Sequence, residues 1–215
     1  MSSLSPEVLS RHMPQSSAGQ VLSGLWIGNL MSVSHLDDII HRTVSDSNTS
    51  SLSDNKKTVV VTVISVLSNP NLIRLATDLI EKQRKKKDIN DCNRTIDIKH
   101  VIIQLKDTVD SDLTSVLPSA LEAIDTVLGP NTNLQSTSDE KRNDNFQRIC
   151  LVHCAKGASR SVSVVLAYLM SRQSNRFKSF DEALSHIRTV RPQASPNIGF
   201  ALELRKYERE LKNNI

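Results

Sequence analysis

The chain of 215 residues contains only three cysteines, and aromatic residues make up 3% of it. So few cysteines exclude a disulfide framework and favour a reducing compartment, the cytoplasm or the nucleus. The N-terminal residues lack the apolar core of a signal peptide, and no apolar run approaches the roughly 20 residues of a membrane span. We therefore expect a cytoplasmic or nuclear protein without a membrane-spanning segment.

The net charge of the chain is also small. The 27 Lys and Arg residues exceed the 23 Asp and Glu residues by enough for a formal net charge of +4. This balance favours acidic, phosphorylated partners, but it is too small to indicate nucleic-acid binding. The sequence carries no indication of an oligomeric state.

The residues that carry chemistry lie between two apolar runs, at 149–152 and from 162 onward. Cys154 and Arg160 stand at this predicted strand-loop-helix junction with five residues between them. Successive backbone N–H groups in such a loop converge on one point, and the helix N-terminus adds partial positive charge there. This setting stabilises a cysteine thiolate and binds a phosphoryl group, so Cys154 is the predicted nucleophile.

Each neighbour of Cys154 has an expected part in this site. The planar guanidinium of Arg160 matches two phosphoryl oxygens, which a lysine does not. Gly157 permits a positive φ. Ser161 is expected to donate a hydrogen bond to the sulfur, and His153 to orient the loop without transferring protons. The residues expected to bind phosphate are Ala155, Lys156, Gly157, Ala158, Ser159 and Arg160.

A proton donor for the leaving oxygen should come from a separate loop. Three aspartates, Asp107, Asp110 and Asp112, follow the predicted strand at 95–105. Asp112 is best explained as the N-cap of a helix that starts at Leu113. Asp107, at the end of the strand, is therefore the expected general acid, with Asp110 as the alternative.

Metal binding is not expected, because a structural zinc site needs four ligands and no second Cys/His pair stands at suitable spacing. The predicted chemistry needs no metal and no organic cofactor. Whether Cys92 or Cys150 traps an oxidised Cys154 as a disulfide stays open at this stage.

Strand and helix patterns alternate along the chain. Strands are expected at 22–30, 58–66, 95–105 and 148–152, and helices at 36–42, 71–86, 113–128, 161–171, 180–189 and 200–211. The alternation predicts a single α/β domain: a twisted, mainly parallel central sheet flanked by helices on both faces. Residues 1–18 are expected to be a mobile tail, and residues 45–57 and 131–147 to be polar insertions.

The segment from Val152 to Met170 resembles the signature of the dual-specificity branch of the cysteine-based protein tyrosine phosphatases. Gly24-Leu-Trp-Ile-Gly-Asn-Leu30 resembles the first-strand motif of this family. Arg191-Pro192 and Ser195-Pro-Asn-Ile-Gly-Phe200 resemble the turn between its C-terminal helices. The resemblance covers residues 19–212 and is to the small, atypical members. Lys156 departs from it, because the family more often has a small or apolar residue there.

The resemblance implies a catalytic domain at 19–212 that hydrolyses phosphotyrosine and phosphoserine or phosphothreonine through a cysteinyl-phosphate. The expected partner is a phosphorylated protein, with a signalling kinase as one candidate. Two alternatives remain. One is a phosphatase for a non-protein phosphate such as a phosphoinositide, an RNA 5′ end or a glucan. The other is a pseudophosphatase that binds phosphate without turnover.

Overall fold

The computed structural model describes residues 18–45, 57–86, 94–129 and 146–213. The predicted N-terminal tail, apart from Ala18, and most of both predicted insertions lie outside these ranges. The insertion boundaries were partly wrong, because Lys57 and residues 146–147 belong to strands. Main-chain pairing is the physical reason: Lys57 lies opposite Arg94, and Phe146 lies opposite Thr58, so polar and exposed residues extend the ladder.

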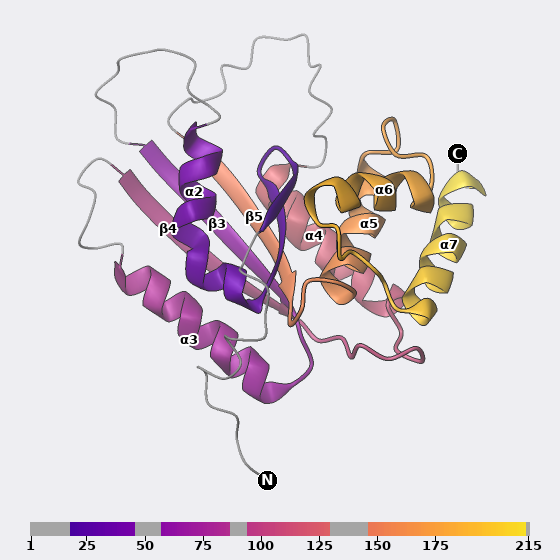
Figure 1. Cartoon of the computed structure of the whole chain (residues 1–215). Coiled ribbons are helices and arrows are strands. Elements are labelled where there is room, and N and C mark those ends of the chain that lie inside the picture. Colours follow the sequence, from indigo (N-terminus) through magenta and orange to yellow (C-terminus); the bar gives the residue numbers. More distant parts are fainter. Residues whose placement is uncertain (1–17, 46–56, 87–93, 130–145, 214–215) are drawn as a thin grey trace.

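Within the described ranges, five strands form one sheet in the order β1-β2-β5-β3-β4 (Figure 1). Only β1 is antiparallel to its neighbour; the other pairs are parallel. The apolar, β-branched residues of the central strands suit a sheet that is covered on both faces. The strands are β1 (Gly19–Leu22), β2 (Leu25–Asn29), β3 (Lys57–Val66), β4 (Arg94–Ile103) and β5 (Phe146–Cys154).

Helices cover both faces of the sheet, which confirms the predicted fold class. One face carries the first two α-helices, and the other carries the last four (Figure 1). The α-helices are α2 (Leu36–Ser45), α3 (Pro70–Lys86), α4 (Leu117–Leu128), α5 (Arg160–Arg172), α6 (Phe180–Val190) and α7 (Ile198–Asn213). Two 3-10 turns, η1 (Leu30–His35) and η3 (Thr114–Val116), precede α2 and α4.

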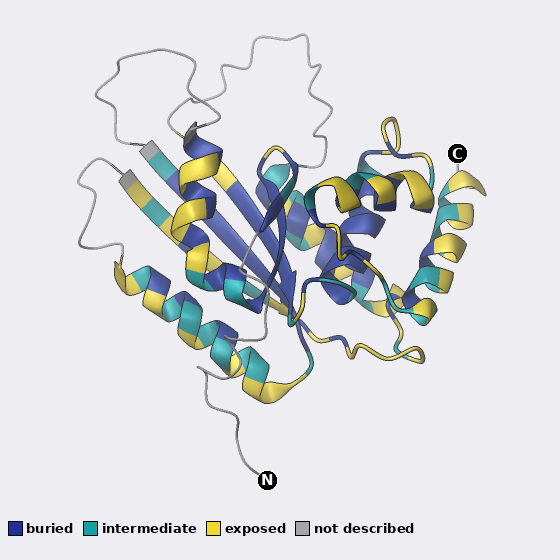
Figure 2. Cartoon of the chain, viewed as in Figure 1, coloured by how far each residue is buried: buried dark blue, intermediate teal, exposed yellow. Residues whose placement is uncertain are grey.

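The alternation of side chains along the strands divides the core into two layers. Val63 and Leu151 pack with residues of α2 and α3, whereas Ile64 and Val152 pack with α4 and α5. Figure 2 shows that the central strands and α5 are almost wholly buried, while α3 and α7 are buried along one side only. Because α5 is buried on nearly all sides, the residue at its N-terminus is held rigidly.

The predicted helix start at Leu113 was only partly right. Asp112 Oδ1 accepts a hydrogen bond from the Ser115 backbone N–H at 2.9 Å, which is the contact that a cap makes. The first turn after it is the 3-10 turn η3, and the α-helix starts at Leu117, just before a proline at its second position. Proline is well placed there because its missing N–H has no partner in a first turn.

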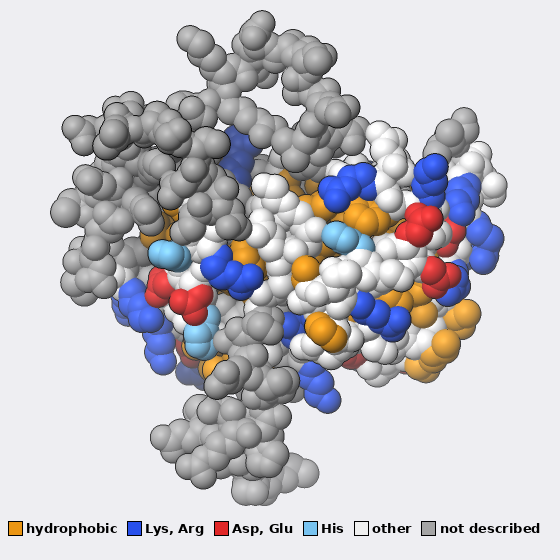
Figure 3. Space-filling view, turned by 45° about the horizontal axis from the view of Figure 1, so that its top comes forward, with side chains coloured by type: hydrophobic (Ala, Val, Ile, Leu, Met, Phe, Trp, Pro, Cys, Tyr) orange, Lys and Arg blue, Asp and Glu red, His pale blue; other side chains and the backbone are white. Residues whose placement is uncertain are grey.

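The surface does not concentrate charge of one sign over the C-terminal helices. Figure 3 shows Lys and Arg side chains next to Asp and Glu side chains on that side of the molecule. One such contact is the paired hydrogen bonding of Arg205 to Asp181, which joins α7 to α6. Among the described residues, every helix is too short or too polar to cross a lipid bilayer.

Candidate active site

Cys154 is the last residue of β5, and α5 begins six residues later at Arg160. The residues between them, 155–159, form what we call the phosphate loop. The sulfur of Cys154 accepts hydrogen bonds from the Gly157 backbone N–H at 3.2 Å and from the Ser161 hydroxyl at 3.3 Å. Both donors stabilise negative charge on the sulfur, which is the form that acts as a nucleophile.

The carbonyl groups of the phosphate loop are bonded to groups outside it. Leu30 N–H donates to Ala155 O, Arg191 donates to the carbonyls of Lys156 and Gly157, and Ser195 N–H donates to Ala158 O. In a trans peptide, the C=O and the following N–H point in opposite directions. Carbonyls fixed outward therefore turn the loop N–H groups inward, towards the space above the sulfur.

Gly157 is required by the shape of this loop. Its φ is +67°, in the left-handed region that residues with a side chain disfavour. A Cβ at this position would also collide with the Gly28 carbonyl and the Arg191 guanidinium. The loop thus depends on glycine both for its backbone conformation and for its close approach to β2.

Arg160 and Asp107 lie on the same side of the loop. Arg160 Nε is 3.4 Å from Asp107 Oδ2, and Arg160 Nη1 is 3.5 Å from the Leu105 carbonyl. The guanidinium therefore contacts both the Asp107 side chain and the backbone just before it. Asp107 Oδ1 accepts hydrogen bonds from Ser159 Oγ at 2.7 Å and from Asn197 Nδ2 at 3.0 Å. The aspartate side chain, about a third exposed, is therefore tied to the phosphate loop.

The other two aspartates of this segment are less suited to proton donation. Asp112 is engaged as the cap described above. Asp110 is exposed, and its pKa is lowered by hydrogen bonding to Thr108 and to its own backbone N–H, which favours the ionised form over the proton-donating form. Of the three, Asp107 is the carboxyl group that contacts the phosphate loop.

His153 lies behind the loop and not beside the sulfur. Its Nε2 is 2.6 Å from the Ser65 hydroxyl, and its Nδ1 is 3.4 Å from the Cys154 carbonyl. The ring is fully buried, and burial lowers its pKa to about 4. The imidazole thus contacts the backbone at the start of the loop, and the orienting role of His153 stays a prediction.

The sequence reasoning missed two residues of this site. Arg191, just after α6, is 1% exposed, and its Nε and Nη2 donate to Gly157 O at 2.5 Å and Lys156 O at 3.0 Å. Asn197, before α7, bonds both Asp107 and Ser159. Neither role follows from the local sequence pattern, because an arginine or asparagine at a helix boundary is usually solvated. Both residues stand in motifs that resemble the phosphatase family, but those motifs gave them no role in the site.

Lys156 and Cys150 differ sharply in their surroundings. Lys156 is exposed on the phosphate loop, where it borders the site. Cys150 is fully buried, and burial raises the pKa of its thiol. Cys154 comes four positions after Cys150 along the same strand, about 13 Å away, which is too far for a disulfide without backbone movement. Cys92 lies outside the described residues.

Among the described side chains, none form a cluster that could hold a metal ion.

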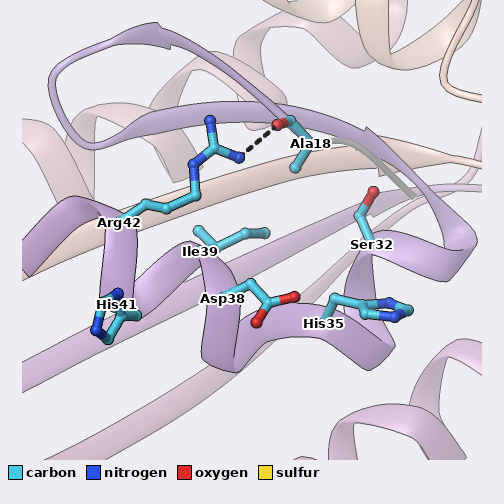
Figure 4. Close-up of a pocket in the computed structure, with 7 residues that line it drawn as sticks. All are labelled: Ala18, Ser32, His35, Asp38, Ile39, His41 and Arg42. Atoms are coloured by element: carbon cyan, nitrogen blue, oxygen red, sulfur yellow. Dashed lines mark hydrogen bonds between the residues drawn. The ribbon is translucent and has the colours of Figure 1, made fainter. Parts of the chain in front are cut away.

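A separate cavity of about 370 Å³ lies between η1, α2 and Ala18 (Figure 4). Its charged lining includes Asp38 and Arg42, and Arg42 Nη1 donates to the Ala18 carbonyl at 3.3 Å. The same guanidinium lies over the Trp26 ring, 4.6 Å from its centre. No residue of the phosphate loop lines this cavity, and Cys154, Arg160 and Asp107 are not among its lining residues.

Residues 55–210 match the family model for the dual specificity phosphatase catalytic domain. Among characterised proteins, the chain is 44% identical over 63 residues to mouse dual specificity phosphatase 28, covering 29% of this chain and 37% of the mouse protein. It is 30% identical over 118 residues to dual specificity protein phosphatase 1B of Arabidopsis thaliana, covering 55% and 59%. The chain thus spans a minority of the first relative and little more than half of the second.

Solved structures share the fold across nearly the whole chain. Human DUSP28 matches with a TM-score of 0.58 at 18% identity, covering 93% of this chain and 98% of that one. A mouse putative dual specificity phosphatase, crystallised with zinc tungstate, matches with a TM-score of 0.56 at 21% identity, covering 94% and 92%. At these identities the likeness concerns the fold alone.

Arg191 should be essential to phosphate binding although it lies beneath the loop. We expect Arg191→Lys to weaken the affinity for inorganic phosphate by at least about 10-fold, because an ammonium group does not replace a planar fork on two carbonyls. Titration calorimetry with phosphate measures this, and Arg205→Lys, at an exposed ion pair, is the matched control. Equal affinities in the two variants would contradict the assigned role of Arg191.

Burial of His153 should make the fold sensitive to acid. Its pKa is 6.5 as a free side chain and about 4 in the folded chain, so only the unfolded chain gains a proton as the pH falls through 6.5 towards 4. Above pH 6.5 His153 is neutral in both the folded and the unfolded chain, and its contribution to stability is complete. By about pH 5 the free energy of unfolding should have fallen by about 2 kcal/mol.

Urea unfolding of the wild type and of His153→Gln at about pH 8 and about pH 5 tests this. The glutamine variant should lose less stability on acidification, whereas His41→Gln, at an exposed position on α2, should behave like the wild type. The same pH dependence in all three proteins would show that His153 is not the responsible group.

Proposed function

This chain belongs to the family of dual specificity phosphatase catalytic domains, and we propose that it hydrolyses phosphotyrosine and phosphoserine or phosphothreonine in proteins. The observation that carries the proposal is the bonding of the Cys154 sulfur to Gly157 N–H and Ser161 Oγ, inside a loop whose carbonyls are turned outward. A nucleophile at the floor of converging donors suits transfer of a phosphoryl group.

The first chemical step forms a bond between the Cys154 sulfur and phosphorus. The bond from phosphorus to the ester oxygen breaks, and Asp107 gives its proton to the departing oxygen. Arg160 and the loop N–H groups bind the equatorial phosphoryl oxygens, where charge is spread in the transition state. Ser159 and Asn197 hold the Asp107 carboxyl group next to Arg160.

The second step hydrolyses the cysteinyl-phosphate. A water molecule attacks phosphorus and passes a proton to Asp107, while the sulfur–phosphorus bond breaks. The products are inorganic phosphate and the Cys154 thiolate, which the hydroxyl of Ser161 receives through the 3.3 Å hydrogen bond. The enzyme returns to its starting state, with Asp107 protonated again and no external cofactor consumed.

We further propose a cytoplasmic or nuclear setting and a phosphorylated protein, with a signalling kinase as a candidate, as the substrate. The reactive thiol at the site supports a reducing compartment. Lys156, exposed beside the loop, supports a substrate with acidic groups near the phosphorylated residue.

Hydrolysis of aryl phosphates in the presence of a chelator tests the mechanism. Cys154→Ser should abolish turnover. Arg160→Lys should also lack activity, because the lysine ammonium does not replace the guanidinium. Asp107→Asn should lower kcat by about 10²- to 10⁴-fold, and by more with a poor leaving group than with a good one, because the acid is needed most when the leaving oxygen is basic.

Two matched controls accompany these variants. Cys150→Ala removes the other described thiol, and Asp110→Asn removes the alternative acid; both should keep turnover. Full activity in Cys154→Ser, or an Asp107→Asn effect that is independent of the leaving group, would contradict the mechanism. Phosphopeptides, phosphoinositide vesicles, RNA with a 5′ triphosphate and phosphorylated glucan then separate the substrate classes. Phosphate binding without turnover of any of them would favour the pseudophosphatase.

A further inference from the structure

Three polar side chains form a connected line behind the phosphate loop. Ser65 Oγ of β3 lies 2.6 Å from His153 Nε2 of β5 and 2.8 Å from His100 Nε2 of β4. Ser65 is directly opposite His153, whereas His100 is opposite Val63 and hence diagonal to Ser65. All three side chains stand on the face that α3 covers, near the carboxyl ends of three neighbouring parallel strands.

The direction of the hydrogen bonds in this line follows from its last member. The Cys154 carbonyl only accepts, so the hydrogen of His153 is on Nδ1, which lies 3.4 Å from that oxygen. A neutral His153 then has a bare Nε2, which accepts the single hydrogen of the Ser65 hydroxyl. Ser65 in turn accepts a hydrogen bond from His100 Nε2–H.

The outer end of the line is under the C-terminal part of α3. His100 is half-buried, and its pKa is lowered mainly by burial and next by Arg84, with Glu81 acting in the opposite direction. Arg84 donates to the Ile98 carbonyl on the same strand as His100. At the inner end, the titratable His100 and the charged Arg160 are the groups that His153 faces.

We propose that Ser65 and His100 are positioning residues that fix the tautomer of His153 and, through it, the first peptide of the phosphate loop. Cys154 O and Ala155 N–H belong to the same trans peptide, so a hydrogen bond that holds the carbonyl backward turns the N–H forward into the site. The other tautomer would set a nitrogen lone pair against the carbonyl oxygen and disturb that orientation. The effect on turnover rests on the proposed function; the effect on His153 does not.

Nitrogen-15 NMR of the histidine rings tests the proposal without reference to catalysis. In the wild type, His153 should carry its hydrogen on Nδ1. Ser65→Ala should raise the population of the Nε2–H tautomer, and His100→Leu should do so less strongly. His100→Gln, which keeps an N–H donor, should remain like the wild type. Ser171→Ala, whose hydroxyl bonds the Ala167 carbonyl elsewhere in α5, is the control for loss of a serine.

The rate of alkylation of Cys154 across pH is the second readout, with Cys154→Ser to subtract other thiols. Ser65→Ala should slow alkylation near neutral pH by about 3- to 10-fold, the change that one net hydrogen bond gives. The double variant Ser65→Ala/His100→Leu should be no slower than Ser65→Ala, because His100 acts through Ser65.

An Nε2–H tautomer of His153 in the wild type would overturn the proposal. So would an unchanged tautomer and alkylation rate in a folded Ser65→Ala protein. If Ser65→Ala does not fold, His100→Leu and His100→Gln form the decisive pair, and equal behaviour of these two variants would overturn it. A wild type that shows the expected tautomer but no turnover would instead contradict the proposed function.

Discussion

The outward bonding of four successive carbonyls in the phosphate loop is the constraint on which the site depends. A five-residue turn at the end of a strand has no regular ladder to fix it, so its shape comes from partners elsewhere in the chain. Those partners are the backbone after β2, the segment before α7 and the buried guanidinium of Arg191. Arg191 bonds two of the carbonyls and the other two partners bond one each, so the N–H groups of the loop are left facing the sulfur.

The fold supplies these partners from distant parts of the sequence. Parallel strands bring Cys154 next to Asn29, and the rigid, buried α5 fixes Arg160 at the other end of the loop. The segment between α6 and α7 then crosses beneath the loop with Arg191 and reaches Asp107 with Asn197. The backbone at Gly199 also lies close to the Val109 carbonyl, since a Cβ on Gly199 would collide with that oxygen. Asp107, Arg160 and Cys154 are therefore positioned by one connected set of contacts.

Much of this arrangement was predictable from local pattern. The strand-loop-helix junction, Gly157 with its positive φ, and the layered α/β sheet all follow from spacing, apolar periodicity and the limits of backbone conformation. Arg191, Asn197, Ser65 and His100 did not follow, because their roles arise from contacts across 34 or more residues of sequence and leave no local period. The insertion boundaries failed for another reason: main-chain pairing continues a strand regardless of polar side chains.

The central claim is that phosphorus becomes bonded to Cys154 during turnover. The most direct measurement is mass spectrometry of the Cys154 peptide after rapid quenching of Asp107→Asn during hydrolysis of an aryl phosphate with a good leaving group. Loss of the base that activates water should slow the second step, so the peptide should gain the mass of one phosphoryl group, and Cys154→Ser should gain none. Continued release of phosphate without any phosphoryl group on Cys154 would contradict the account.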